Sequence, residues 1–92
     1  MIRSIRHKGL LRFFSTGDKR GINAKHAARI ERLLDRLDAA GKPDDMNLAG
    51  FKFHALTGFD PTRYAVSVSG NWRITFAFDG EDAVDVDLED YH

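Results

Sequence analysis

Between positions 64 and 78, hydrophobic and polar side chains alternate in the pattern of two adjacent β-strands. One face of these strands is predicted to carry Tyr64, Val66, Val68, Trp72, Ile74, Phe76 and Phe78. The opposite face is predicted to carry Ala65, Ser67, Ser69, Arg73, Thr75 and Ala77. Strict alternation of this kind is typical of a sheet that is buried on one face only. Gly70 and Asn71, between the two runs, tolerate positive φ and so predict a two-residue hairpin turn.

Two segments in the first half of the chain show the spacing of amphipathic helices instead. The first helix is expected at residues 7–14, with an apolar side made of Leu10, Leu11, Phe13 and Phe14. A longer helix is expected to start at Asn23, a good N-cap, and to end near residue 40, before Gly41 and Pro43. Its buried stripe is predicted to contain Ala27, Ile30, Leu33, Leu34 and Leu37.

Three further segments, at residues 1–6, 51–56 and 83–91, read as strands. In the last of them the side chains expected to point inward are Val84, Val86 and Leu88. Those expected to point outward are Asp85, Asp87, Glu89 and Tyr91. Early helices followed by consecutive strands with short connections predict an α+β fold. We therefore expect one domain, residues 1–92, with two N-terminal helices packed on one face of a small, mostly antiparallel, twisted sheet.

Composition narrows the class of protein. The chain has 92 residues, of which 42% are hydrophobic and 30% charged, as in a globular domain with one modest core. No apolar run approaches the length of a membrane span and no secretory signal is evident, so a cytoplasmic location is expected. The absence of cysteine excludes disulfides and thiolate metal sites.

The net charge of zero hides an uneven distribution. Residues 1–32 have nine Lys or Arg and two acidic residues, whereas residues 33–92 have five and twelve. A basic half suggests a polyanion or an acidic partner, although ordinary solvation of charged helix faces explains it somewhat better. Seven acidic residues lie near the C-terminus and are expected on a turn or sheet edge: Asp79, Glu81, Asp82, Asp85, Asp87, Glu89 and Asp90.

The exposed face of the predicted sheet collects groups that suit an anion such as a phosphate backbone. They are Lys52, His54, Ser67, Arg73, Thr75 and Tyr91, with His92 just beyond. The sequence has no glycine-rich phosphate loop, no metalloprotease motif and no serine nucleophile elbow, and no metal site of standard spacing. A site with acids, bases and a cation suits RNA, whose 2′-hydroxyl can itself attack the adjacent phosphate.

Several segments together resemble the HigB toxins of the RelE/ParE superfamily. They are IRSIRHKGL, AKHAARI, DMNLAGFKFHAL, VSGNWRITFAF and the closing DYH. The resemblance covers nearly the whole chain and implies a RelE-like fold and a ribosome-dependent mRNA endonuclease that needs no metal or cofactor. It also implies a HigA-type helix-turn-helix antitoxin, mRNA on the ribosome and ribosomal RNA as partners, operator DNA only through the antitoxin, and no membrane.

The resemblance also implies roles for five residues. Arg73, in NWR, would stabilise the extra charge on the phosphorane, and His54 would bind or polarise the phosphate. Tyr91 and His92 would transfer protons or orient the 2′-hydroxyl, and Asp90 would position them or contact the substrate.

The chain departs from the family at Thr57, in HALTG, where many relatives continue with lysine in a pattern like HPLKG. Threonine can hydrogen-bond a phosphate but supplies no cation, so at this RNA-binding position either the reaction runs with fewer charges or Lys52 or Arg63 compensates. On charge alone, the candidates for ribosomal RNA contact are Lys19, Arg20, Lys25 and Arg29.

Other interpretations remain open at this level. Arg73 could pair with Asp85 or Asp87 across the sheet, and the C-terminal pair could be a frayed tail. Trp72 is expected to anchor the core, because it alternates with Ile74. The fold also allows a ParE-type toxin that acts on DNA gyrase without nuclease activity, or a catalytically weak module that only binds an antitoxin.

Overall fold

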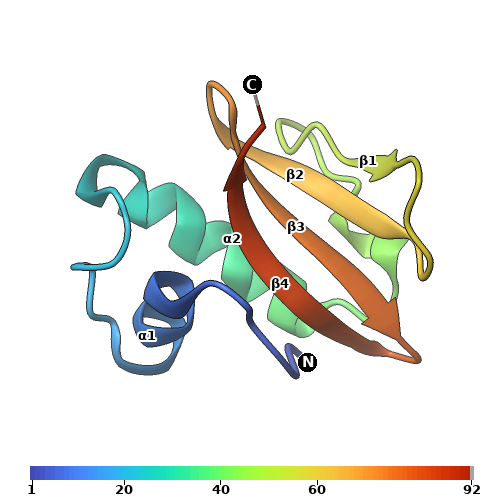
Figure 1. The fold of residues 1–92 in the computed structure, drawn as a ribbon, viewed down its shortest axis with the longest axis horizontal. Coiled ribbons are helices and arrows are strands. Elements are labelled where there is room, and N and C mark those ends of the chain that lie inside the picture. The colour runs from blue at the N-terminus through green and yellow to red at the C-terminus, as the bar shows by residue number, and fades with distance from the viewer. Residues whose placement is uncertain (92) are drawn as a thin grey trace.

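The structure, a computed structural model, describes residues 1–91. Its helical elements are α1 (Lys8–Thr16), the 3₁₀ turn η1 (Ala24–His26), α2 (Ala27–Ala39) and the 3₁₀ turn η2 (Pro43–Met46). Its strands are β1 (His54–Leu56), β2 (Arg63–Ser69), β3 (Trp72–Asp79) and β4 (Asp82–Asp90). The strands form one sheet in the order β1-β2-β3-β4, with every neighbouring pair antiparallel (Figure 1). The expected α+β fold is confirmed.

Both expected helices form, with ends set by local chemistry. The Nδ1 of His7 accepts a hydrogen bond from the Leu10 amide at 3.0 Å and so caps α1, which ends at Gly17 in the left-handed region with φ 79°. Asn23 caps the backbone of Lys25 at 3.0 Å, but it begins η1 and not α2, so the predicted long helix is divided into a 3₁₀ turn and an α-helix.

The core lies between the sheet and α2, which passes behind the sheet in Figure 1. The predicted apolar stripe of α2 is buried, as are Val66, Val68, Ile74 and Phe76 of the central hairpin. The α1 residues Leu10 and Phe13 belong to the same cluster. The start of α1 touches the loop that follows the helix, because a Cβ on Gly9 would lie 2.1 Å from the Gly21 carbonyl oxygen.

A β-bulge in β4 overturns part of the predicted alternation. Thr75 pairs with Asp87, whereas Ala77 pairs with Val84, so an extra residue is accommodated between them at Asp85, whose φ is 52°. The bulge reverses the phase of the strand, which buries Ala83 fully and puts Val84 on the other face. The inward prediction for Val84 was therefore wrong, because a period of two fails wherever a strand carries one unpaired residue.

The edges of the sheet also differ in detail from expectation. The segment predicted as strand 1–6 joins the edge of β4 through two isolated parallel bridges, Ile2 with Ala83 and Ile5 with Val86. The strand expected at 51–56 begins only at His54. Trp72 is 37% exposed and lies at the edge of the core, so its prediction as a core anchor was wrong. No helix in the described part of the chain is both long and apolar enough to cross a membrane.

Candidate active site

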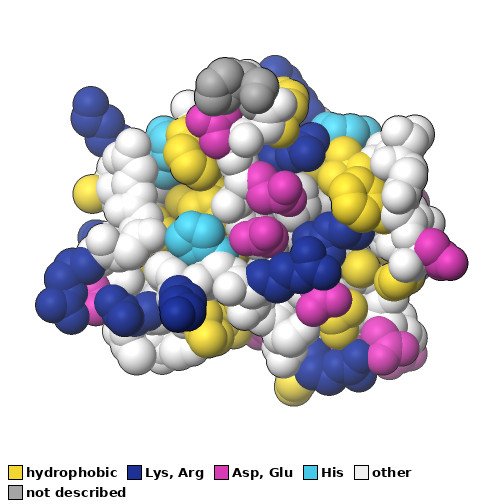
Figure 2. All heavy atoms as spheres, in the orientation of Figure 1, with side chains coloured by type: hydrophobic (Ala, Val, Ile, Leu, Met, Phe, Trp, Pro, Cys, Tyr) yellow, Lys and Arg dark blue, Asp and Glu magenta, His cyan; other side chains and the backbone are white. Residues whose placement is uncertain are grey.

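The side chains of two rows across the sheet point away from α2. Ser67, Arg73 and Glu89 form one row, since each is paired in register with the next, and Ala65, Thr75 and Asp87 form the second. His54 continues the second row on β1, because it pairs with Ala65. Figure 2 shows basic and acidic side chains gathered over the strands on this open face. The predicted polar face therefore exists, and it extends across all four strands.

Arg73 and Tyr91 meet on this face, as the resemblance implied. The guanidinium carbon of Arg73 lies 4.4 Å from the centroid of the Tyr91 ring, within the range of a cation–π contact. The Nε of Arg73 is buried and has no hydrogen-bond partner among residues 1–91. No ion pair joins Arg73 to Asp85 or Asp87 in the described chain, so that alternative is excluded. Because Nε is buried and Arg73 as a whole is half-buried, an external anion could meet this guanidinium only through its outer nitrogens.

The other members of the predicted C-terminal group are placed differently. The Tyr91 amide donates to the Asn71 carbonyl at 3.2 Å, which fixes the chain to the hairpin turn at this point. Asp90 pairs in register with Trp72 and so starts from the face opposite to Arg73. His92 lies outside the described residues.

His54 shares the open face but stands apart from Arg73. Its Nδ1 is 2.9 Å from the carbonyl oxygen of Lys52, so Nδ1 is the protonated nitrogen and Nε2 is left as an acceptor in the neutral ring. Because β1 is two strands away from β3, about 10 Å separates the two backbone positions. His54 can therefore reach the same substrate as Arg73 only at a different point.

The three residues expected to bind RNA are not equivalent. Lys52 and Thr57 are exposed, Lys52 with a φ of 52° before β1 and Thr57 in the turn after it. Arg63 is only 5% exposed, and its Nη2 donates to Thr75 Oγ1 at 2.9 Å and to the Asp85 carbonyl at 2.8 Å. Burial, followed by the nearby charge of Arg6, lowers the pKa of Arg63 below its ordinary value. Arg63 therefore does not replace the missing lysine as an exposed cation.

Sequence reasoning missed a hydrogen-bonded chain on this face. The buried hydroxyl of Thr75 accepts from Arg63 and donates to the carboxylate oxygen Oε2 of Glu89. The alternation in β4 did predict that Glu89 faces outward, but nothing in the sequence indicated that an arginine would be buried to hold it.

Many of the charges outside this face are satisfied internally. Arg3 pairs with Asp79 and, at 3.5 Å, with Asp82, while Arg6 lies 3.6 Å from Asp85. These three acidic residues therefore balance the N-terminal segment at the far end of the sheet from Tyr91, as their expected place on a turn or edge allows.

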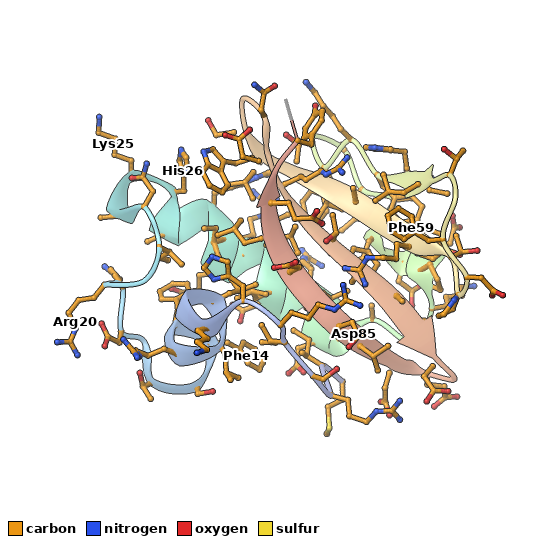
Figure 3. The ribbon with its side chains drawn as sticks, viewed as in Figure 1. Phe14, Arg20, Lys25, His26, Phe59 and Asp85 are labelled. Atoms are coloured by element: carbon orange, nitrogen blue, oxygen red, sulfur yellow. The ribbon has the colours of Figure 1, made fainter. Side chains whose placement is uncertain are left out.

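The basic residues proposed for ribosomal contact divide into two kinds. Arg29 donates to the carbonyls of Gly50 at 2.7 Å and Ser67 at 3.0 Å, so its guanidinium fastens α2 to β2 and to the loop before β1. Arg20 and Lys25 instead extend outward beside the helices (Figure 3). Arg20 pairs with Asp18 at 2.8 Å, and its side chain and amide donate hydrogen bonds that lower the pKa of Asp18 to about 2.

Comparison with known proteins agrees with the geometry. Residues 3–92 match the family model of the RelE-like toxin of the type II toxin–antitoxin system HigB. The chain is 38% identical to Endoribonuclease HigB of Proteus vulgaris over 92 residues, which is the whole length of both proteins. The chain therefore belongs to the HigB family of RelE-like toxins of type II toxin–antitoxin systems, and as such has an antitoxin as its partner.

Proposed function

We propose that this toxin is an endoribonuclease that cleaves mRNA and so inhibits translation. The observation that carries the proposal is the guanidinium of Arg73, which stacks on Tyr91 on the open face and forms no ion pair within the described residues. A phosphate can accept hydrogen bonds from the outer guanidinium nitrogens, because the planar fork of arginine suits two phosphate oxygens at once. The 38% identity to a protein named as an endoribonuclease supports the same activity.

The reaction follows from the groups available. The ribose 2′-hydroxyl attacks the adjacent phosphate, and Arg73 stabilises the negative charge that develops on the phosphorane. The C-terminal pair, Tyr91 and His92, protonates the leaving 5′-oxygen, and Asp90 positions that pair. The products are a 2′,3′-cyclic phosphate and a 5′-hydroxyl, and the reaction requires neither a metal nor a cofactor.

The remaining site residues bind the substrate on either side of this phosphate. His54 lies on β1, where its Nε2 can accept a hydrogen bond from a ribose 2′-hydroxyl of the RNA. Lys52 and Thr57 add one cation and one hydroxyl close by, both of them exposed. Threonine in place of the family's lysine removes one charge, so cleavage is expected to be slower than in relatives that have the lysine.

The face is open, and this shape favours a substrate that another molecule holds in place. The described side chains form an open surface, with a hollow of about 90 Å³ beside Arg63 and Phe59. Such a surface cannot immobilise a flexible single strand by itself, so we infer that the ribosome presents the mRNA and that ribosomal RNA contacts the exposed basic residues. The proposed antitoxin is a HigA-type helix-turn-helix protein, through which alone the toxin meets operator DNA in the cytoplasm.

The test is to induce the protein in cells and map the ends of ribosome-bound mRNA. Cleavage within translated codons, with 2′,3′-cyclic phosphate and 5′-hydroxyl ends, is the expected result. Growth arrest with intact mRNA and a DNA-damage response would instead favour a gyrase-directed toxin. Binding of the antitoxin without any growth arrest would indicate that the protein is only an antitoxin-binding module.

A further inference from the structure

Glu89 occupies an unusual position relative to Arg73. The two residues are direct partners in the β3–β4 register, and such partners have Cβ atoms about 4.5–5.5 Å apart. An acid and an arginine this close normally form an ion pair, which would neutralise the cation. No ion pair joins these two described residues. Something therefore holds the carboxylate away from the guanidinium.

The restraint is the hydroxyl of Thr75. A threonine hydroxyl has one hydrogen to donate, and the Nη2 of Arg63 can only donate to it. The hydroxyl hydrogen must then point to Glu89 Oε2, so the carboxylate is the acceptor. Thr75 is fully buried and Arg63 is 5% exposed, so the two residues that hold Glu89 in place are themselves rigidly packed.

The hydrogen bond from Thr75 uses only Oε2 of Glu89, which leaves the other carboxylate oxygen, Oε1, available for catalysis. Oε1 of Glu89 takes part in none of the hydrogen bonds of this chain, and the side chain is half-buried on the open face. Tyr91 directly follows β4, and its ring lies over the Arg73 guanidinium on the same face. A phosphate held by Arg73 would therefore have a fixed carboxylate on one side and the tyrosine on the other.

We propose that Glu89 is the general base of the cleavage reaction, with Thr75 and Arg63 as its positioning residues. This inference rests on the proposed endoribonuclease function. The carboxylate takes the proton of the ribose 2′-hydroxyl as the 2′-oxygen forms its bond to phosphorus. The bond from phosphorus to the 5′-oxygen then breaks, and that oxygen receives a proton from the C-terminal pair. The number of protons is conserved, and no further reactant is needed.

The test compares Glu89→Gln with wild type in single-turnover cleavage of a defined mRNA bound to ribosomes, over a range of pH. Loss of the base should slow cleavage by about 10²-fold to 10⁴-fold. It should also flatten the acid side of the pH–rate profile, because the general base is gone. Asp87→Asn is the matched control, since it removes the same charge two residues away on the same face and should keep both the rate and the pH profile.

Two substitutions of Thr75 separate positioning from folding. Thr75→Ser keeps the hydroxyl and should cleave within a few-fold of wild type, whereas Thr75→Val frees Glu89 to pair with Arg73 and should slow cleavage at least tenfold. Thermal unfolding of each variant shows whether it is folded.

Three results would overturn the proposal. They are a Glu89→Gln rate within threefold of wild type, an unchanged acid limb in that variant, and an equal loss in Asp87→Asn. If wild type itself yields no cyclic-phosphate ends, the endoribonuclease proposal fails and this one fails with it. If wild type yields cyclic-phosphate ends and Glu89→Gln is equally active, the proposal that Glu89 is the general base is rejected, while the endoribonuclease proposal stands.

Discussion

Replacing Arg73 by alanine should separate catalysis from stability more clearly than any other change on the open face. The substitution removes the charge that is expected to meet the phosphorane. Loss of one such stabilising group typically costs about 10²–10³ in rate, or about 3–4 kcal/mol of transition-state stabilisation. The stability cost is smaller, because the contact with Tyr91 is a cation–π interaction with a ring that is 53% exposed. At such a site the contact is worth about 0.5–1 kcal/mol.

Arg73→Lys separates the contribution of the positive charge from that of the guanidinium shape. It retains the positive charge but loses the planar fork and the stacking on Tyr91, so an intermediate rate, about tenfold below wild type, is expected. The control is Arg36→Ala, which removes an exposed arginine from α2, on the covered side of the sheet. The assay is single-turnover cleavage of ribosome-bound mRNA, with thermal unfolding measured on the same preparations. Cleavage by Arg73→Ala within threefold of wild type would refute the role assigned to this guanidinium.

Three further predictions concern stability and pH. Gly9→Ala drives a Cβ to within 2.1 Å of the Gly21 carbonyl oxygen, and the cost of overpacking should exceed the gain in helix propensity, so chemical denaturation should show a loss of about 1–2 kcal/mol. Arg29→Ala removes charged hydrogen bonds to two backbone carbonyls and should lower the free energy of unfolding by about 1–2 kcal/mol; an unchanged denaturation midpoint would argue for a purely external role. Arg20→Ala should raise the pKa of the Asp18 carboxyl from about 2 part of the way toward 3.8, as followed by NMR titration. Because that pKa is depressed in the folded state, its contribution to stability is present above about pH 3.8 and is lost as the pH falls toward 2.

The sequence by itself determined the elements and the faces of the central strands. Alternation from residue 64 to 78 is enforced by burial of one side of the sheet, so Arg73 had to face away from the helices. His54 and Tyr91 were assigned to the same face by the same period of two; the register agrees for His54, and Tyr91 contacts Arg73 on that face. Local patterns sufficed here because the alternation of side chains depends only on neighbouring residues in the sequence and on which face of the sheet is exposed to solvent.

Only the tertiary structure decided how the polar groups use that face. The bulge at Asp85 shifts the phase of β4 and exchanges Ala83 for Val84 in the core, which no local pattern predicts. The burial of Arg63 and its hydrogen bond to Thr75 depend on contacts between residues 12 positions apart. The orientation of Glu89 follows in turn from that bond. Hydrogen-bond partners are chosen by three-dimensional proximity and by the cost of leaving a buried donor unsatisfied, so they emerge only when the strands are assembled.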